Sequence, residues 1–167
     1  YINRPFDAGV VHRREYNTIK LYAKQRRLIA LITNQVYEKE KNNRMMVGIL
    51  SQIVEFRNGE SGSHVLNINI FTGMLLESLV QHTDKYDLSW AERLLITTAS
   101  ALHDIGKIGI DDKILNKPGR LTNEEFEVIK THSVIGASML ESLEYYKDEP
   151  LVRIAHDICR WHHERYD

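Results

Sequence analysis

The chain has 167 residues, of which 43% are hydrophobic and 27% charged, and its formal net charge is −1. This composition is typical of a globular domain large enough to bury a core. The near-zero net charge argues against a nucleic-acid polymer or a membrane as partner, so any phosphate recognition must be local. Cys159 is the only cysteine, which excludes an internal disulfide and fits a reducing cytoplasm, and its apolar neighbours predict a buried, inert thiol.

The first residues, Tyr1-Ile2-Asn3-Arg4-Pro5-Phe6-Asp7, resemble the last strand and loop of a receiver domain. In such domains a Lys-Pro-Phe tripeptide precedes the final helix, and Arg4 stands here in the lysine position. The resemblance covers residues 1–25. It predicts that the sequence is part of a longer, multidomain chain.

Residues 10–56 are predicted to form a helical linker. Their apolar positions recur at spacings of three, four and seven, which is typical of an amphipathic helix or a short coiled coil. Two interpretations remain open: a signalling helix that dimerises, or a helix packed on its own domain. The polar stretch from Glu38 to Arg44 predicts a hinge or a turn between two helices.

Helices are also predicted for the rest of the chain, because no segment alternates as a strand does. A glycine-containing break at 58–63 precedes a helix over 64–81. Capping boxes at Ser89-x-x-Glu92 and Thr122-x-x-Glu125 predict two more helix starts. The first of these helices is expected to run to His103, the second carries His132 in its middle, and Pro150 begins the last segment. The sequence therefore predicts an all-α helical bundle with ligands pointing into its core.

A metal site is predicted from the run His103-Asp104-Ile105-Gly106-Lys107 together with the surrounding histidines. Imidazole and carboxylate are ligands that suit iron, manganese, nickel and zinc. In an adjacent His-Asp pair the imidazole can bind one metal while the carboxylate bridges two. The candidate metal ligands are Glu60, His64, His103, Asp104, His132, His162 and His163.

Each candidate has an ordinary alternative when it is taken alone. His132 fits a core histidine, Glu60 a solvated loop acid, and the His162-His163 pair a polar surface. Their joint occurrence with His-Asp-x-Gly-Lys favours metal binding. A second doublet, His156-Asp157, lacks the x-Gly-Lys that follows the first, so we expect it to be structural or solvent-facing.

The order of these motifs resembles the HD-GYP family, a subgroup of the HD phosphohydrolases. The similarity extends from about Leu50 to the end, and it rests on four motifs: His103–Ile110, Ile114–Thr122, His132 and His162–Asp167. The resemblance implies a helical domain that holds two or three metal ions, usually iron or manganese, and hydrolyses cyclic di-GMP. Carried over by position, the six matching histidine and aspartate candidates are metal ligands, and Glu60 is the carboxylate of members that bind a third metal. Asp104 and Lys107 are then the catalytic residues, with Lys107 contacting a phosphate or protonating a leaving oxygen.

The sequence departs from the family pattern at its C-terminal end. The sequence stops at Asp167, where the family continues into Gly-x-Gly-Tyr-Pro and a further aspartate ligand. We therefore expect 57–167 to be an HD-GYP-type metal-binding domain that is incomplete at its C-terminus, preceded by the linker over 10–56.

The main functional hypothesis is a metal-dependent phosphodiesterase that converts cyclic di-GMP to pGpG or GMP, as the output domain of a two-component-type protein. Two metals would bind the scissile phosphate and activate the attacking water. Lys117 and Arg120 would hold the second phosphate or a guanine; otherwise they are ordinary cations beside a turn. Two alternatives remain: a general HD phosphohydrolase acting on other nucleotides, and a catalytically inactive signalling module. A homodimer formed through the N-terminal helix is a further prediction.

Overall fold

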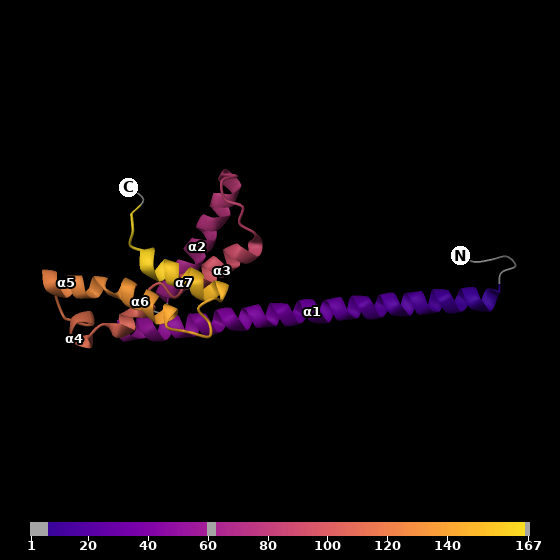
Figure 1. The fold of residues 1–167 in the computed structure, drawn as a ribbon, viewed down its shortest axis with the longest axis horizontal. Helices are drawn as coiled ribbons and strands as arrows, with labels where there is room; N and C mark the ends of the chain where they lie inside the picture. The colour runs from indigo at the N-terminus through magenta and orange to yellow at the C-terminus, as the bar shows by residue number, and fades with distance from the viewer. Residues whose placement is uncertain (1–6, 60–62, 166–167) are drawn as a thin grey trace. The chain divides into compact units, whose positions relative to one another are not determined.

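The computed structural model describes residues 7–59 and 63–165. Within these ranges the backbone forms helices and no strand, which confirms the predicted all-α class. In chain order the elements are α1 (Ala8–Arg57), α2 (Ser63–His82), α3 (Trp90–Ser100), the 3₁₀ helix η1 (Ile105–Gly109), α4 (Asp112–Leu115), α5 (Asn123–Lys130), α6 (His132–Glu141) and α7 (Pro150–Trp161) (Figure 1). No helix in the described part of the chain combines the length and apolar character that crossing a membrane requires.

The chain divides into two compact units, with the boundary between Asn43 and Arg44. The hinge predicted for Glu38 to Arg44 is wrong, because α1 is helical through this stretch. Glutamate, lysine and arginine are strong helix formers, and the stretch contains neither glycine nor proline. Lys41 also lies 4.0 Å from Glu38 at the i, i+3 spacing. A polar interruption of the apolar pattern was therefore no evidence for a break in the backbone.

In the first unit the predicted apolar positions of α1 are exposed. Their exposed fractions run from 50 to 69%, at Ile19, Tyr22, Leu28, Ile29, Ile32 and Val36. In the second unit α1 does contribute buried residues in its last two turns, namely Ser51, Val54 and Glu55. The end of α1 therefore belongs to the packed interior of the second unit.

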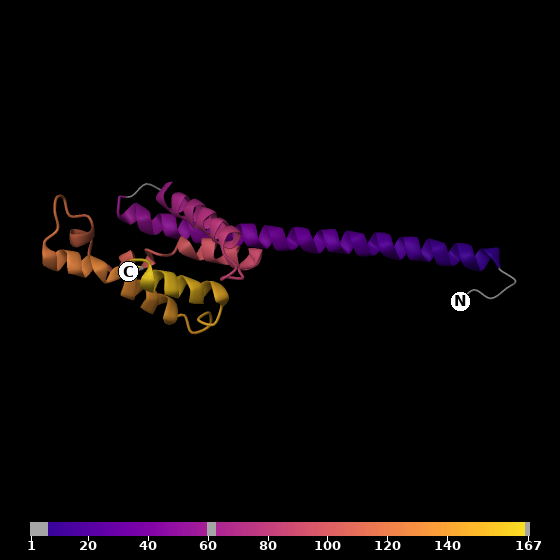
Figure 2. The ribbon, with the colours of Figure 1, turned by 90° about the horizontal axis from the view of Figure 1, so that it is seen from above.

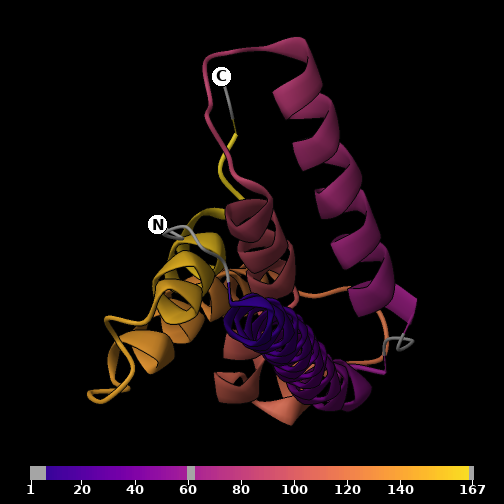
Figure 3. The ribbon, with the colours of Figure 1, turned by 90° about the vertical axis from the view of Figure 1, so that its right-hand side faces the viewer.

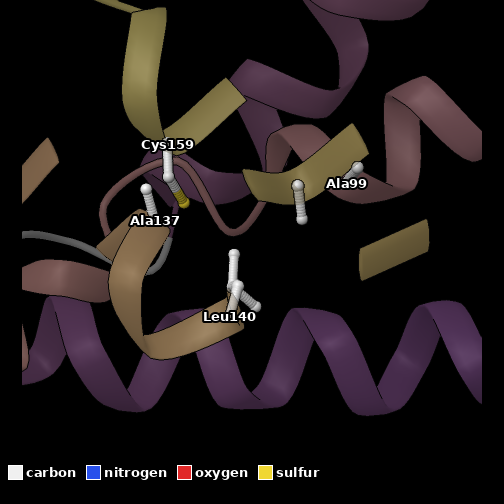
Figure 4. Close-up of a cluster of buried hydrophobic side chains, with 5 residues drawn as sticks. Ala99, Ala137, Leu140 and Cys159 are labelled. Carbon is white, nitrogen blue, oxygen red and sulfur yellow. The ribbon is translucent and has the colours of Figure 1, made fainter. Parts of the chain in front are cut away.

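The helices of the second unit pack in the order α2, α3, α7, α6, with η1 against α6. Figures 2 and 3 show α6 and α7 running side by side, with α3 next to α7. The small core between them consists of Ala99, Ala137, Leu140, Ala155 and Cys159 (Figure 4). Four of these five side chains are small, which lets the helix backbones approach closely. Leu102 and Ile105, on either side of the His103-Asp104 pair, pack against this core and so fix the backbone around the pair.

Cys159 is fully buried in this core, as its apolar neighbours predicted. Its Sγ donates a hydrogen bond to the carbonyl oxygen of Leu102 at 3.0 Å. Burial, and then the negative charge of Asp104, raise the pKa of the thiol to about 12. The prediction that this thiol is buried is confirmed.

The helix starts predicted from the capping boxes are confirmed. The predicted positions of His103 and His132 inside helices are wrong, because each helix ends before the histidine. Ser89 and Thr122 each form a complete capping box. α3 ends at Ser100, so His103 lies in the turn beyond it. α5 ends at Lys130, because Thr131 bonds back to Val128 through both its backbone N–H and its hydroxyl. His132 is therefore the first residue of α6 and not the middle of a longer helix.

Candidate metal centre

The His-Asp motif lies on consecutive tight turns. The backbone N–H groups of His103, Ile105 and Lys107 donate to the carbonyls of Ser100, Leu102 and Asp104, each three residues earlier. In 3₁₀ geometry side chains at i and i+3 eclipse one another. Asp104 and Lys107 therefore share one face, and Nζ of Lys107 lies 3.0 Å from Oδ2 of Asp104. The sequence spacing of the motif thus fixes the carboxylate and the ammonium side by side.

Asp104 lies at the centre of the site and is buried, with 9% of its surface exposed. Its Oδ2 lies 3.1 Å from Nε2 of His103. Its Oδ1 lies 3.1 Å from Nε2 of His132 and 3.7 Å from Nε2 of His162. One carboxylate thus reaches histidines from three different parts of the chain, the turn after α3, the start of α6 and the end of α7.

Three of these histidines are oriented in the same way by backbone carbonyls. Nδ1 of His103 lies 3.0 Å from the carbonyl of Ser100, that of His132 2.6 Å from Ile129, and that of His162 3.0 Å from Cys159. A carbonyl can only accept, so each Nδ1 carries the proton. The lone pair of each neutral ring then lies on Nε2 and points into the site, as in histidines that bind a metal.

The Nε2 atoms converge. Nε2 of His132 lies 3.2 Å from that of His162 and 3.2 Å from that of His163. Because His132 and His162 both carry the proton on Nδ1, their Nε2 lone pairs face each other and cannot form a hydrogen bond between neutral rings. Their approach, and that of Nε2 to Asp104, becomes favourable when a cation lies between them. The donor set therefore fits one or more divalent metal ions.

Two groups of ligands can be distinguished within this cluster. His132, His162 and His163 form one, and Glu55, His64, His103 and Asp104 the other; in each group the ligand atoms lie within 4.8 Å of one another. Asp104 links the two groups, since its Oδ1 also contacts His132. A pocket of about 500 Å³ opens on the cluster and is lined by His64, Ile68, Thr72, Ser100, His103, Asp104, Ile158, His162 and His163.

The electrostatics favour an ionised Asp104. Burial would raise the pKa of its carboxyl, but the contacts with His103 and His132, whose Nε2 atoms donate when the rings are protonated, the positive charge of such a His103 and a hydrogen bond from Lys107 hold that pKa far below its usual range. Burial opposes a charge on His103, yet Asp104 outweighs it, so the pKa of His103 is raised. Burial lowers the pKa of His162 and of His163, helped by the neighbouring imidazoles. A cation that replaces a proton on such imidazoles is stabilised by the same carboxylate.

Six of the seven predicted metal ligands come together: His64, His103, Asp104, His132, His162 and His163. Glu60 lies outside the described residues. The predicted substrate contacts do not line the 500 Å³ pocket: Lys117 pairs with Glu125, whose carboxylate oxygens lie 2.8 and 2.6 Å from its Nζ, and Arg120 is exposed. His156 and Asp157 pair with each other at 3.0 Å, and neither belongs to the metal-ligand groups found among the described residues.

The structure adds Glu55, which the sequence interpretation missed. It lies in the last turn of α1, only 2% of its surface is exposed, and its Oε1 is 3.7 Å from Nε2 of His64. The sequence did contain a sign of a buried acid, since Glu55 is the only acidic residue between Lys41 and Gly59 and directly follows Ile53 and Val54. Its position in a helix rich in charged residues hid it among solvated side chains.

Comparison with known proteins identifies the family. The model of the HD domain matches residues 62–167, which is more than half of the chain. The chain belongs to the HD-domain family. This confirms the resemblance to the HD phosphohydrolases that the His103-Asp104 motif indicated. The matched region contains His64 and all the downstream ligands, but not Glu55.

Relatives of this HD domain include named phosphodiesterases. The whole chain is 34% identical over 83% of its length to a cyclic di-GMP phosphodiesterase of Vibrio cholerae serotype O1. It is 33% identical over 86% of its length to the cyclic di-GMP phosphodiesterase response regulator RpfG of Xanthomonas campestris pv. campestris. It is 31% identical over 80% of its length to the 3′3′-cGAMP-specific phosphodiesterase 2 of Vibrio cholerae. The matched regions span 30%, 34% and 24% of these relatives.

Proposed function

We propose that this HD domain is a metal-dependent phosphodiesterase that hydrolyses cyclic di-GMP to pGpG, or to GMP after a second cut. The observation that carries the proposal is the position of Asp104 between two groups of inward-facing ligands at the pocket of about 500 Å³. The names of the relatives, among them cyclic di-GMP phosphodiesterases from two genera, support the same substrate class. The chain acts as the output domain of a two-component-type protein, as the word "response regulator" in one relative's name supports.

The metals are two or three divalent ions, iron or manganese, with nickel and zinc as alternatives that the same donors suit. His132, His162 and His163 would hold one ion, and His64, His103 and a carboxylate would hold another; Asp104 lies within reach of both groups. Glu60 is the extra carboxylate for a third ion, and Glu55 is a second candidate for that role because of its position beside His64. A divalent metal at such a site supplies Lewis acidity, which makes water more acidic and draws electron density from a phosphoryl group.

The chain's own residues have distinct parts in the reaction. The carbonyls that hold Nδ1 of three histidines keep Nε2 aimed at the site through turnover. Asp104 stays ionised and orients Lys107 through their 3.0 Å contact. The Lys107 ammonium offsets the negative charge that develops on a phosphate oxygen, or gives its proton to the leaving oxygen. Lys117 and Arg120 do not line the pocket, so they would contact a part of the substrate that extends beyond it, the second phosphate or a guanine.

The test combines metal content with hydrolysis. The protein is purified anaerobically, its metals are measured by elemental analysis, and cyclic di-GMP, pGpG and GMP are separated by chromatography. We expect about two or more equivalents of iron or manganese per chain, and hydrolysis that Asp104→Asn abolishes. Asp157→Asn, in the second His-Asp doublet, is the matched control and leaves both unchanged. Full activity of Asp104→Asn contradicts the mechanism.

A different cyclic dinucleotide is the second candidate substrate, because one relative is named for 3′3′-cGAMP. Rates on the two dinucleotides, measured side by side, decide between them. Hydrolysis of nucleotides outside this class would favour a general HD phosphohydrolase. Metal binding without turnover of any of them would instead favour a signalling module without catalysis.

The exposed apolar side chains along α1, such as Ile29 and Ile32, support a homodimer formed through the region 10–56. A monomer in sedimentation at tens of micromolar would contradict it. A cytoplasmic location, expected from the single cysteine, belongs to the same proposal.

A further inference from the structure

Arg57, the last residue of α1, holds the segment that carries Lys107. Its Nη1 donates to the carbonyl oxygens of Lys107 at 2.9 Å and Ile108 at 2.6 Å, and its Nη2 donates to that of Ile110 at 2.7 Å. These carbonyls lie at the C-terminal end of η1, where a helix leaves its last carbonyls without donors in a following turn; that of Lys107 accepts from the Ile110 N–H as well. One guanidinium thus satisfies three carbonyls in four consecutive residues.

Further contacts fix Arg57 itself. Its Nη2 lies 2.8 Å from Oδ1 of Asp112, at the start of α4. Nδ2 of Asn116 donates to the Arg57 carbonyl at 3.0 Å, at the end of α4. The planar fork of arginine can reach carbonyls and a carboxylate at once, which the compact ammonium of lysine cannot reproduce. The side chain is about two-thirds buried, with 31% exposed.

The same helix end reaches the site from a second direction. Glu55, two residues before Arg57, is buried beside His64 in one ligand group. Lys107, whose carbonyl Arg57 binds, contacts Asp104 through its Nζ. The last turns of α1 therefore contact both the upstream ligand His64 and the backbone of the His-Asp-Ile-Gly-Lys motif.

We propose that Arg57 is a positioning residue that fixes the backbone from Lys107 to Ile110 and thereby holds the Lys107 ammonium at Asp104. Nothing in the sequence motifs assigns Arg57 a role, since it precedes the first predicted ligand and is the last residue of α1. Its bonds act on Lys107 through the backbone, so loss of Arg57 lets η1 open while the histidine ligands keep their own carbonyl anchors. The consequence for turnover rests on the proposed phosphodiesterase function, whereas the consequence for the order of η1 does not.

Amide hydrogen exchange tests the structural part directly, because the Lys107 and Ile110 amides report opening of η1. They donate to the carbonyls of Asp104 and Lys107 at 3.0 and 3.1 Å. In Arg57→Ala we expect exchange at both amides to rise at least about tenfold, as loss of hydrogen bonds from a charged donor implies. Amides in the middle of α7 should exchange as in the unaltered protein. The exchange rates of these two amides in Arg57→Lys should lie between those in Arg57→Ala and those in the unaltered protein.

Asp112→Asn is the matched control. This variant removes the negative charge that pairs with Arg57, and the Asp112 side chain is 66% exposed. The three hydrogen bonds from Arg57 to η1 remain, so exchange at the Lys107 and Ile110 amides should change little. Equal exchange in Arg57→Ala and the unaltered protein overturns the proposal. An equal rise at every amide, in both the Ala and the Lys variants, also overturns it, because Arg57 then serves general stability.

Kinetics on cyclic di-GMP with saturating metal provide the second readout. We expect kcat of Arg57→Ala to fall at least about tenfold with a smaller change in KM, because misplacing Lys107 removes an interaction with transition-state charge. Metal content should remain near that of the unaltered protein. If the unaltered protein does not hydrolyse the dinucleotide, the proposed function fails, and hydrogen exchange alone still decides the role of Arg57.

Discussion

The backbone of Gly106 lies directly against the carbonyl group of His132. A Cβ at Gly106 would overlap that carbonyl and the backbone nitrogen of Gly136, so no side chain fits between η1 and α6. This close approach sets the distance between Asp104, two residues before Gly106, and His132, and so allows their 3.1 Å contact. The glycine of the His-Asp-x-Gly-Lys motif is therefore required by packing between the two ligand groups.

Gly106→Ala should separate η1 from α6 and destabilise the second unit. Forcing a methyl group into a close-packed contact costs about 1–3 kcal/mol, and here the neighbours are backbone atoms that cannot rotate away. Thermal unfolding should show a lowered Tm, and elemental analysis a loss of metal. Gly48→Ala is the control, because a Cβ added at Gly48 meets nothing within 4 Å and alanine is a better helix former than glycine. Equal Tm values for the Gly106 variant and the unaltered protein would contradict this packing.

His132→Ala should remove metal from the site, because its Nε2 contacts Asp104, His162 and His163. We expect hydrolysis of cyclic di-GMP to fall by more than about 100-fold, beyond the effect of removing a residue that only orients a ligand. His156→Ala provides the comparison, since His156 pairs with Asp157 away from the cluster. Metal content measured on both variants gives the answer. Similar losses in the two would mean that general stability, and not ligation, explains the effect.

Cys159 should react slowly with iodoacetamide in the folded protein and rapidly after unfolding. The thiolate is the reactive form, and burial keeps the thiol protonated with a pKa of about 12. Because the unfolded thiol ionises at lower pH, the folded state holds this proton more tightly. Its contribution to the free energy of unfolding is therefore complete below pH ~8.5 and is lost as the pH rises towards about 12. Mass spectrometry after timed labelling at pH 9 measures the rate, and equal rates with and without denaturant would be inconsistent with the burial.

Lys117 and Arg120 should differ when each is replaced by alanine. Lys117 binds Glu125, which also accepts from the backbone N–H of Thr122 at 2.7 Å, so Lys117→Ala loosens the start of α5. We expect only a slight drop in the free energy of unfolding, since the pair is partly exposed. Arg120 is exposed, and Arg120→Ala should raise KM severalfold at constant kcat. Unchanged KM in both variants would make them ordinary cations beside a turn.

Interactions between near neighbours could be predicted from the sequence. The capping boxes at Ser89 and Thr122 depend on residues three positions apart, and the start of α7 on a single proline at the beginning of the helix. The predicted hinge in α1 failed on the same scale, because helix propensity outweighed the gap in the apolar pattern. The break at Thr131 also escaped prediction, since the apolar spacing continues across it.

The sequence by itself determined the helical class, the family motif and six of the metal-ligand candidates that come together, because residue type and spacing carry that chemistry. Only the tertiary structure decided which other residues join them. Glu55 and Arg57 carry no motif of their own; the first is recruited by packing beside His64, and the second binds a carbonyl 50 residues away. The two ligand groups meet only because η1 packs against α6 without a side chain between them, and contacts across such distances depend on how the helices pack.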